Sequence, residues 1–353
     1  MIGERIKQAR KAAGLSLRAL ADQAGITAMA ISKYEGGKST PSSRVLLELS
    51  KALGVRTEYF FRPVKIELQE MKHRKHSRLP KKALDQIEGD VKEQLERFIE
   101  LEQLLPNGPV QAFKLPENLP ASIATLDEVE AVARDLRKSW DLGVDPIPVL
   151  TDMLEERGIK VFQSQAINDR FDGMAATVDG IPVVVVGRGW PGDRQRFTLA
   201  HELGHLVLQG RLAPGVEEEA AANRFAGAFL APEEEVRKEL GEKRVWLEPR
   251  ELEVLKKAYG LSMQGWMHRA KDLGILPDAH YVEMRKFFSS RGWNKTEPGE
   301  QYVSERPQLF DQLVYRALAQ DLISESKAAE LLRMPLTEFQ RKRSMQGDRA
   351  APH

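Results

Sequence analysis

The sequence predicts a multidomain, mainly α-helical protein: an N-terminal all-α domain, an α+β domain with a small sheet, and a helical C-terminal region. Two observations support this. Apolar residues recur at helical spacing along most of the chain, whereas β-branched runs broken by Gly and Pro are confined to residues 159–186. The 353 residues suffice for two or three domains, and 42% hydrophobic with 30% charged residues can build real cores.

Composition excludes several classes of protein. The chain has no cysteine, which rules out a disulfide scaffold, thiol catalysis and Cys-ligated zinc. Its longest apolar run, Ile181–Val186, is far shorter than the roughly 20 residues that span a bilayer. The N-terminus lacks the apolar core of a signal peptide. We therefore expect a soluble, cytoplasmic protein with no membrane partner.

The nearly balanced total charge hides a division between the two ends of the chain. Residues 1–82 carry 18 Lys and Arg against 7 Asp and Glu, while the remainder carries 35 against 45. A basic N-terminal segment on an acidic body indicates that this end meets a polyanion such as nucleic acid.

Four short helices are expected in the basic segment. The first has apolar residues at helical spacing from Ile6, and Ser16 can cap the second. Gly25 supplies a tight turn, Thr27 caps the third helix, and Thr40-Pro41 begins the fourth. Two helices joined by a Gly turn, the second free to enter a major groove, form a helix-turn-helix.

Residues 3–61 resemble the XRE, phage-repressor-like DNA-binding domains. The matching elements are Leu20-Ala21, Gly25-Ile26, Ile31-Ser32, Tyr34-Glu35-Gly36 and Pro41…Leu46…Leu49. The resemblance implies a double-stranded DNA operator as partner, and a homodimer, because operators usually mirror a two-fold axis. It places Thr27, Ala28, Met29, Ser32 and Lys33 at the groove and Arg18, Lys38 and Arg44 at phosphates. A protein-interaction module of the same fold is the alternative.

The domains are expected at 1–62 (helix-turn-helix), 63–119 (basic linker and helical connector), 120–300 (α+β domain) and 301–353 (helical region with a disordered tail from residue 346). Within the connector, residues 62–82 are expected to be an exposed linker, and 81–105 return to helical spacing. In the α+β domain we expect helices at about 125–140 and 147–157, three strands, and an Asp179-Gly180 hairpin turn.

A helix opening at Pro191 carries the chemistry, as His201-Glu202-Leu203-Gly204-His205. Histidines at i and i+4 share one helical face and can bind a single zinc ion. Glu202 would project beside the metal, where it can accept a proton from water. A pair of ordinary histidines on an amphipathic helix is the alternative, but the apolar residues around them favour a buried helix.

A third ligand is required, because catalytic zinc normally keeps three protein ligands and one open position. Without cysteine it must be Asp, Glu or His. The next helix begins with Glu217-Glu218-Glu219, and three consecutive side chains point in different directions, so only one of them can coordinate.

Residues 120–300 resemble the ImmA/IrrE zinc metallopeptidases. The resemblance rests on Arg194–Ala200 leading into His201–His205, and on Glu219, Ala222-Asn223-Arg224-Phe225-Ala226 and Pro232. It implies a zincin-like fold, His201, His205 and Glu219 as metal ligands, and Glu202 as general base. The implied metal is Zn²⁺, with Mn²⁺ as the alternative. The oxyanion stabiliser is not located; Arg224, Tyr259 and His268 are candidates, each with a structural alternative.

Together these features predict a DNA-binding transcriptional regulator carrying its own zinc-dependent endopeptidase. The resemblance implies cleavage of a phage-type repressor in stress response or mobile-element control; the substrate could be the chain itself, with residues 62–82 as the cut segment, or a partner repressor. The rival hypothesis is a repressor or antitoxin-like protein whose zincin-like domain is a non-hydrolysing sensor or partner-binding module. A third is a protease whose helix-turn-helix serves protein contacts.

The C-terminal region is expected to be helical. Apolar residues recur at helical spacing from Leu309 to Leu318 and again over Ser324–Leu332. Ala328–Leu332 after a short break hints at a second helix-turn-helix-like pair, and a packing or oligomerisation element is the alternative that the pattern alone favours.

Overall fold

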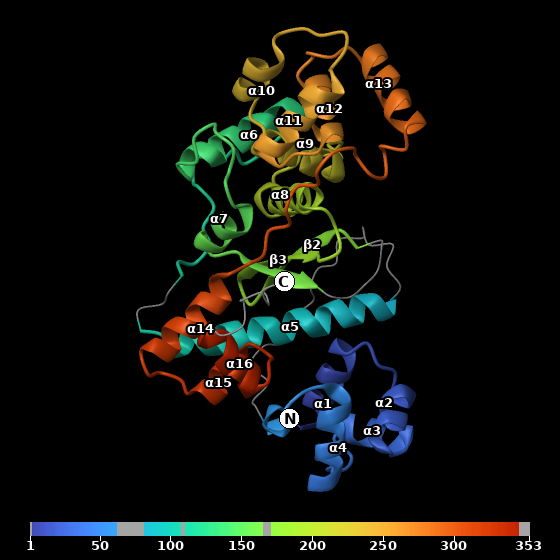
Figure 1. The fold of residues 1–353 in the computed structure, drawn as a ribbon, viewed down its shortest axis with the longest axis vertical. Coiled ribbons are helices and arrows are strands. Elements are labelled where there is room, and N and C mark those ends of the chain that lie inside the picture. Colours follow the sequence, from blue (N-terminus) through green and yellow to red (C-terminus); the bar gives the residue numbers. More distant parts are fainter. Residues whose placement is uncertain (1, 62–80, 107–109, 165–170, 346–353) are drawn as a thin grey trace, which may run out of the picture. The chain divides into compact units, whose positions relative to one another are not determined.

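Helices dominate both halves of the chain, as the apolar spacing predicts. A computed structural model describes residues 2–61, 81–106, 110–164 and 171–345. The chain divides into two compact units (Figure 1): the first comprises residues 1–111 and 307–353 with the turn 178–180, and the second comprises 112–177 and 181–306. The predicted linker at 62–82 and the predicted tail at 346–353 lie outside the described residues, apart from 81 and 82.

The first unit opens with the four predicted short helices. They are α1 (Ile2–Ala12), α2 (Leu17–Ala24), α3 (Ala28–Glu35) and α4 (Ser43–Leu53), followed by a 3₁₀ turn at Thr57–Phe61. Ser16 and Thr27 cap α2 and α3 by accepting hydrogen bonds from Ala19 N at 3.1 Å and Ala30 N at 3.2 Å. The fourth helix begins later than expected: Ser42, not Thr40, is its cap, because its hydroxyl accepts from Val45 N.

A separate apolar core holds these helices together. It contains one fully buried side chain from each of them and one from the 3₁₀ turn: Ile6, Leu20, Ile31, Leu49 and Phe60. Arg10 on α1 donates to both carboxylate oxygens of Glu35 on α3, at 2.6 and 2.8 Å. The core and this bidentate pair fix α3 against α1. The turn at Gly25 (φ 65°) lies between α2 and α3.

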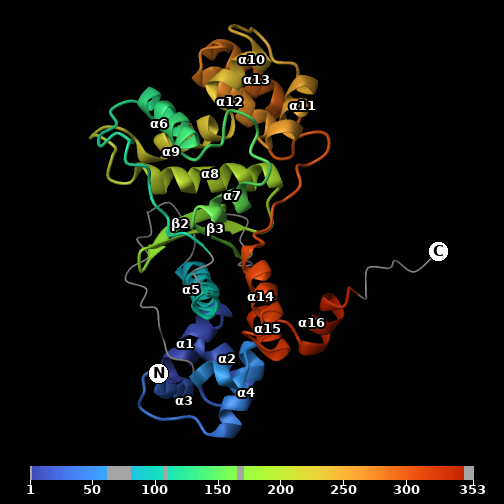
Figure 2. The same ribbon diagram turned by 90° about the vertical axis from the view of Figure 1, so that its left-hand side faces the viewer.

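The remaining helices of the first unit are α5 (Lys81–Leu104), α14 (Leu309–Ala319), α15 (Glu325–Leu331) and α16 (Leu336–Arg343). One face of α5 packs on α1, where Arg5, only 2% exposed, pairs with Glu96 of α5. Another part of α5 binds the C-terminal helices, with Lys327 of α15 donating to Glu100 at 2.7 Å. The C-terminal segment is therefore helical, as expected, and belongs to the same unit as the N-terminal helices (Figure 2).

The second unit is built on one small sheet and a group of helices. Its elements are α6 (Leu126–Ser139), α7 (Leu150–Glu156), β1 (Lys160–Ser164), β2 (Gly173–Val178), β3 (Ile181–Gly187), α8 (Gly192–Leu208), α9 (Glu218–Leu230), α10 (Glu233–Leu240), α11 (Pro249–Tyr259), α12 (Met263–Asp272) and α13 (Asp278–Ser290). All three predicted strands are present, in the order β1-β3-β2, and β1 runs parallel to β3 with Phe162 opposite Val185.

The predicted hairpin joins β2 to β3. Asp179 and Gly180 both have positive φ, at 50° and 81°, as a two-residue turn between twisted antiparallel strands requires. Helix α8 lies across the sheet and against β3 (Figures 1 and 2). The sheet therefore supports the helix that carries the predicted metal ligands.

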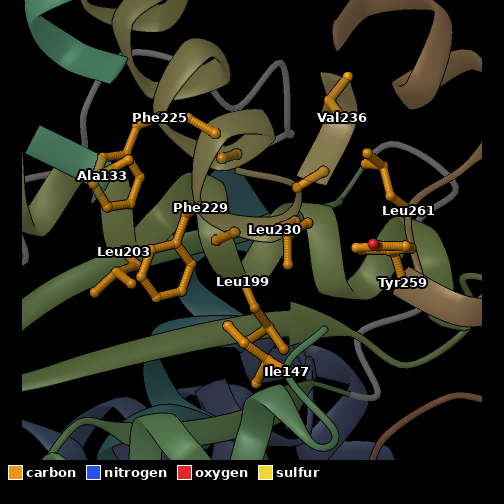
Figure 3. Close-up of a cluster of buried hydrophobic side chains, with 14 of the residues drawn as sticks. Ala133, Ile147, Leu199, Leu203, Phe225, Phe229, Leu230, Val236, Tyr259 and Leu261 are labelled. Carbon is orange, nitrogen blue, oxygen red and sulfur yellow. The ribbon is translucent and has the colours of Figure 1, made fainter. Parts of the chain in front are cut away.

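A large apolar cluster fills the space between α8, α9 and the other helices of this unit. Figure 3 shows Leu199 and Leu203 of α8 gathered with Phe225, Phe229 and Leu230 of α9, all at most 1% exposed. Burying side chains of this size contributes roughly 1.5–3 kcal/mol each. The cluster fixes α9 relative to α8, which decides what the start of α9 can reach.

None of the helices described by the structure combines the length and apolar character needed to cross a bilayer.

Candidate functional site

Helix α8 presents His201 and His205 on one face, as their spacing requires. Their Nε2 atoms lie 3.0 Å apart, and the rings meet nearly perpendicular. His205 is buried, at 7% exposure, and His201 is partly exposed on its outer side. Two imidazole nitrogens thus converge on one point at the end of a supported helix.

The first turn of α9 brings a carboxylate to the same point. Glu219 Oε1 lies 3.1 Å from His205 Nε2, and its Oε2 lies 3.5 Å from His201 Nε2. Among the described residues, these three form the one group of His, Asp and Glu side chains found to converge in this way.

The spacing of these atoms fits a tetrahedral metal ion. Zinc–ligand distances of about 2.0–2.2 Å place two tetrahedral ligand atoms roughly 3.3–3.6 Å apart. The two histidine nitrogens lie 3.0 Å apart, and the two oxygens of the Glu219 carboxylate lie 3.1 Å from His205 Nε2 and 3.5 Å from His201 Nε2, which is close to that value. Two nitrogens and one carboxylate oxygen also suit Zn²⁺ chemically, and Mn²⁺ accepts the same donors.

The packing of α8 on α9 makes this convergence possible. A Cβ added to Gly204 would lie 3.0 Å from Cδ1 of Phe225, so the absence of a side chain lets the two helices approach closely. The space beside Gly204 is filled by the Phe225 side chain of α9. Because α9 is close, its first turn reaches the histidines.

Two side chains that the sequence left without a role orient the histidines. Asn223 Oδ1 lies 2.9 Å from His201 Nδ1, and Glu218 Oε1 lies 3.4 Å from His205 Nδ1. An amide oxygen only accepts hydrogen bonds, so Nδ1 of His201 carries the proton and Nε2 keeps its lone pair for a metal. Asn223 follows Glu219 by one helical turn, a spacing that could have suggested its place beside the ligand.

Glu202, the predicted general base, is on the same helix and 8% exposed. It lies near the start of β2, because a Cβ placed on Gly173 would come within 3.6 Å of Glu202 Cγ and 2.4 Å of Thr198 Cγ2. The absent side chain at Gly173 thus leaves room for β2 beside Glu202. The Glu202 side chain is therefore buried where α8 meets the start of β2, and Glu202 directly follows His201 in the sequence.

The three oxyanion candidates have other partners. Arg224 donates to Glu130 at 2.8 Å, and the same carboxylate binds Arg269 at 2.6 and 2.9 Å. Tyr259 donates to Glu235 at 2.9 Å. His268 contacts the Tyr281 hydroxyl at 2.7 Å, and burial lowers the pKa of His268, which favours its neutral form. These contacts favour the structural alternative for all three.

The predicted DNA contacts lie in the helix-turn-helix as follows. Met29, Ser32 and Lys33 are exposed on α3, with Met29 69% exposed, and Ala28 is partly covered. Thr27 is exposed and also serves as the cap of α3. The predicted DNA contacts include four cationic residues, Arg18, Lys33, Lys38 and Arg44. All four are exposed, and no carboxylate of the described residues lies within ion-pair distance of them. Their charge is available to a polyanion.

Comparison with known proteins assigns two domains. Residues 6–60 match the helix-turn-helix family, and residues 154–271 match the IrrE N-terminal-like domain. Both resemblances seen in the sequence are therefore confirmed. The chain combines a DNA-binding helix-turn-helix domain with an IrrE-like, peptidase-type domain, and its mainly helical fold with a small three-stranded sheet agrees with the predicted fold class.

Two similar proteins each match less than a fifth of the chain. The chain is 42% identical over 62 residues to an SPbeta prophage-derived HTH-type transcriptional regulator of Bacillus subtilis, covering 18% of this chain and 57% of that protein. It is 38% identical over 60 residues to a transcriptional regulator in the ATPase CF(0) region of Rhodospirillum rubrum, covering 17% of this chain and 56% of that protein. The chain thus spans just over half the length of these relatives.

Proposed function

We propose that this protein is a cytoplasmic, dimeric transcriptional regulator with an in-chain zinc-dependent endopeptidase, which cleaves a peptide bond in itself or in a partner repressor. The observation that carries the proposal is the convergence of His201, His205 and Glu219, with Glu202 on the same helix as the histidines, in a chain that also has a helix-turn-helix domain. Names of relatives that include a prophage-derived regulator support a role in mobile-element control or stress response.

In this proposal each residue has a defined task. His201, His205 and Glu219 hold the metal, which when bound supplies Lewis acidity toward the scissile carbonyl and a water molecule. The Glu202 carboxylate accepts the proton of the attacking water and returns it to the leaving amine. Asn223 holds His201 in the tautomer that exposes Nε2. The helix-turn-helix binds the operator, with α3 in the major groove.

The DNA contacts proposed are the residues predicted from the sequence. Ala28 and Met29 offer apolar contacts to thymine methyl groups, and Ser32 and Lys33 offer polar ones. Arg18, Lys38 and Arg44 bind phosphates, a role that fits their exposure and lack of carboxylate partners in the described chain.

The test compares the wild-type chain with Glu202→Gln and His201→Ala. Bound zinc is measured by elemental analysis, and cleavage by mass spectrometry of the chain alone and with a purified phage-type repressor. We expect Glu202→Gln to retain zinc and DNA binding and to lose at least 100-fold in cleavage rate, because the isosteric amide cannot accept the proton. His201→Ala should lose both zinc and cleavage.

Cleavage that persists in Glu202→Gln would overturn the mechanism. A wild-type chain that holds zinc but cleaves neither itself nor the repressor would favour the rival hypothesis, in which the domain is a non-hydrolysing sensor or partner-binding module.

A further inference from the structure

The C-terminal helices α15 and α16 repeat the local geometry of α2 and α3. Ser324 caps α15 by accepting a hydrogen bond from Lys327 N at 3.2 Å, as Ser16 caps α2 by accepting from Ala19 N at 3.1 Å. Counted from these two caps, the second helix of each pair begins at the same position and has eight residues. The resemblance is thus one of register as well as of helix order.

The turn between the helices also coincides. Nine residues after each cap the backbone enters the left-handed region, at Gly25 with φ 65° and at Arg333 with φ 53°. Such a φ is uncommon for a residue with a side chain, so the surrounding structure must hold it. Arg333 is held by α5, since its guanidinium donates to Glu93 at 3.0 Å and to Asp90 at 3.3 Å.

The buried positions of the two pairs correspond as well. Ala21 and Ala329, five residues after the caps, are both buried. Ile31 and Phe339, fifteen residues after the caps, are both fully buried. Helix α14 contacts α16 where the Tyr315 ring stacks on Phe339, with centroids 5.9 Å apart. Phe339 thus anchors the inner face of α16, as Ile31 anchors the inner face of α3.

The outer face of α16 carries residues suited to reading DNA. Thr337, Gln340 and Arg341 are exposed, and they occupy the positions of Met29, Ser32 and Lys33 in α3. Glutamine pairs bidentately with adenine and arginine with guanine, so this set offers more direct base contacts than α3 does.

The charges on α16 single out Arg341. Lys342 pairs with Glu338 at 3.1 Å, and Arg343 pairs with Glu325. In contrast, no carboxylate within the described part of the chain lies within ion-pair distance of Arg341, as is also true of Lys33. No large apolar side chain of α16 is among those exposed in the described residues, so its outer face does not suit docking on an apolar protein surface.

We propose that α15 and α16 form a second DNA-binding helix-turn-helix, in which Thr337, Gln340 and Arg341 face the major groove of a duplex. The chain then reads two sequence elements, one with α3 and one with α16. This inference goes beyond the proposed function, which requires only the N-terminal domain for operator binding.

The test selects duplexes from a pool of 60-bp DNA with a random centre, using the full-length chain at fixed salt. Four proteins are compared: wild type, Lys33→Glu, Arg341→Glu and Arg316→Glu. Arg316 is the matched control, an exposed arginine on α14 outside the proposed reading helix. All three substitutions are at exposed positions, and circular dichroism checks that each chain is folded.

We expect the wild-type chain to select two sequence elements. Arg341→Glu should lose one element and bind the wild-type duplex at least tenfold more weakly, Lys33→Glu should lose the other element, and Arg316→Glu should keep both. A single element in the wild type that Arg341→Glu leaves unchanged would overturn the proposal. So would unchanged DNA selection with altered self-association in sedimentation, which would make α16 a protein interface.

These outcomes are separable from a failure of the proposed function. If Lys33→Glu changes nothing while Arg341→Glu removes an element, the N-terminal assignment fails and the C-terminal one stands. If instead Lys33→Glu removes an element while Arg341→Glu changes nothing, the C-terminal assignment fails and the N-terminal one stands.

Discussion

His201 is held by hydrogen bonding on one side so that it can bind a metal on the other. Its Nδ1 faces the amide oxygen of Asn223, and its Nε2 faces His205 and Glu219. In metal sites such outer partners fix the ring orientation and the tautomer, and their loss typically weakens metal binding 10- to 100-fold. In the proposed metal site, the exposed Asn223 is therefore assigned a positioning role and not that of a ligand.

Replacing Asn223 should separate these roles. We expect Asn223→Ala to weaken zinc affinity about 10-fold or more, because Nδ1 loses its acceptor, and Asn223→Asp to retain affinity, because the carboxylate accepts the same hydrogen bond. Chelator competition measures the affinity, and ¹⁵N NMR of the metal-free chain reports the His201 tautomer. Asn294→Ala, at another exposed asparagine, is the control. Unchanged affinity and tautomer in Asn223→Ala would refute the assignment.

At the scale of elements, close approach between helices decides the positions of both functional parts. Phe225 of α9 lies against Gly204 of α8, which brings Glu219 to the histidines. In the first unit α5 lies against the end of α1, where a Cβ on Gly89 would come within 2.6 Å of Ala12 N and 3.0 Å of its Cα. Because the neighbouring atoms belong to the Ala12 backbone, they cannot move aside as a flexible side chain can, and a side chain at position 89 would push α5 away from α1.

Gly89→Ala tests the α1–α5 contact, because the contact and helix propensity predict opposite changes in the free energy of unfolding. Helix propensity alone predicts that alanine stabilises α5 by about 1 kcal/mol. The contact with the Ala12 backbone predicts the opposite, a loss of about 1–3 kcal/mol, since overpacking forces the helices apart. Urea unfolding monitored by circular dichroism measures the difference. A gain in stability would show that α1 and α5 are not closely packed in solution.

At the scale of the whole molecule, the two functional parts belong to different compact units with separate apolar cores. All three proposed metal ligands and Glu202 belong to the second unit, whereas α3 and α16 belong to the first. A ligand stabilises only the folded unit that binds it, by about 2.7 kcal/mol at a concentration 100 times its dissociation constant.

Metal removal should therefore act on one unit. We expect a chelator to lower the melting temperature of the second unit by several degrees in calorimetry, and to leave the transition of the first unit and the affinity for DNA unchanged. His201→Ala should show the lower melting temperature and no response to the chelator. A change in DNA affinity on chelation would contradict this expectation and would indicate that the units are coupled.

Local sequence patterns predicted most helices and strands and the residue types at the candidate metal site. Caps at Ser16 and Thr27, the Asp179-Gly180 turn and the His-Glu-x-x-His spacing are local patterns, and local backbone geometry makes them readable. The start of α4 was placed too early, because Pro41 suits a first helical turn but the hydroxyl of Ser42 makes the capping bond. The domain boundaries and DNA contacts stay predictions.

Which of these residues come into contact depends on the packing of the helices. Three adjacent glutamates gave no distance to the histidines; the packing of α9 on α8 brought Glu219 to both rings and Glu218 to the far side of His205. The partnership of Asn223 with His201 and the match of α15–α16 to α2–α3 likewise depend on contacts and backbone angles. Such features arise from long-range packing, which a local pattern does not specify, and they are what connects the fold to the proposed chemistry.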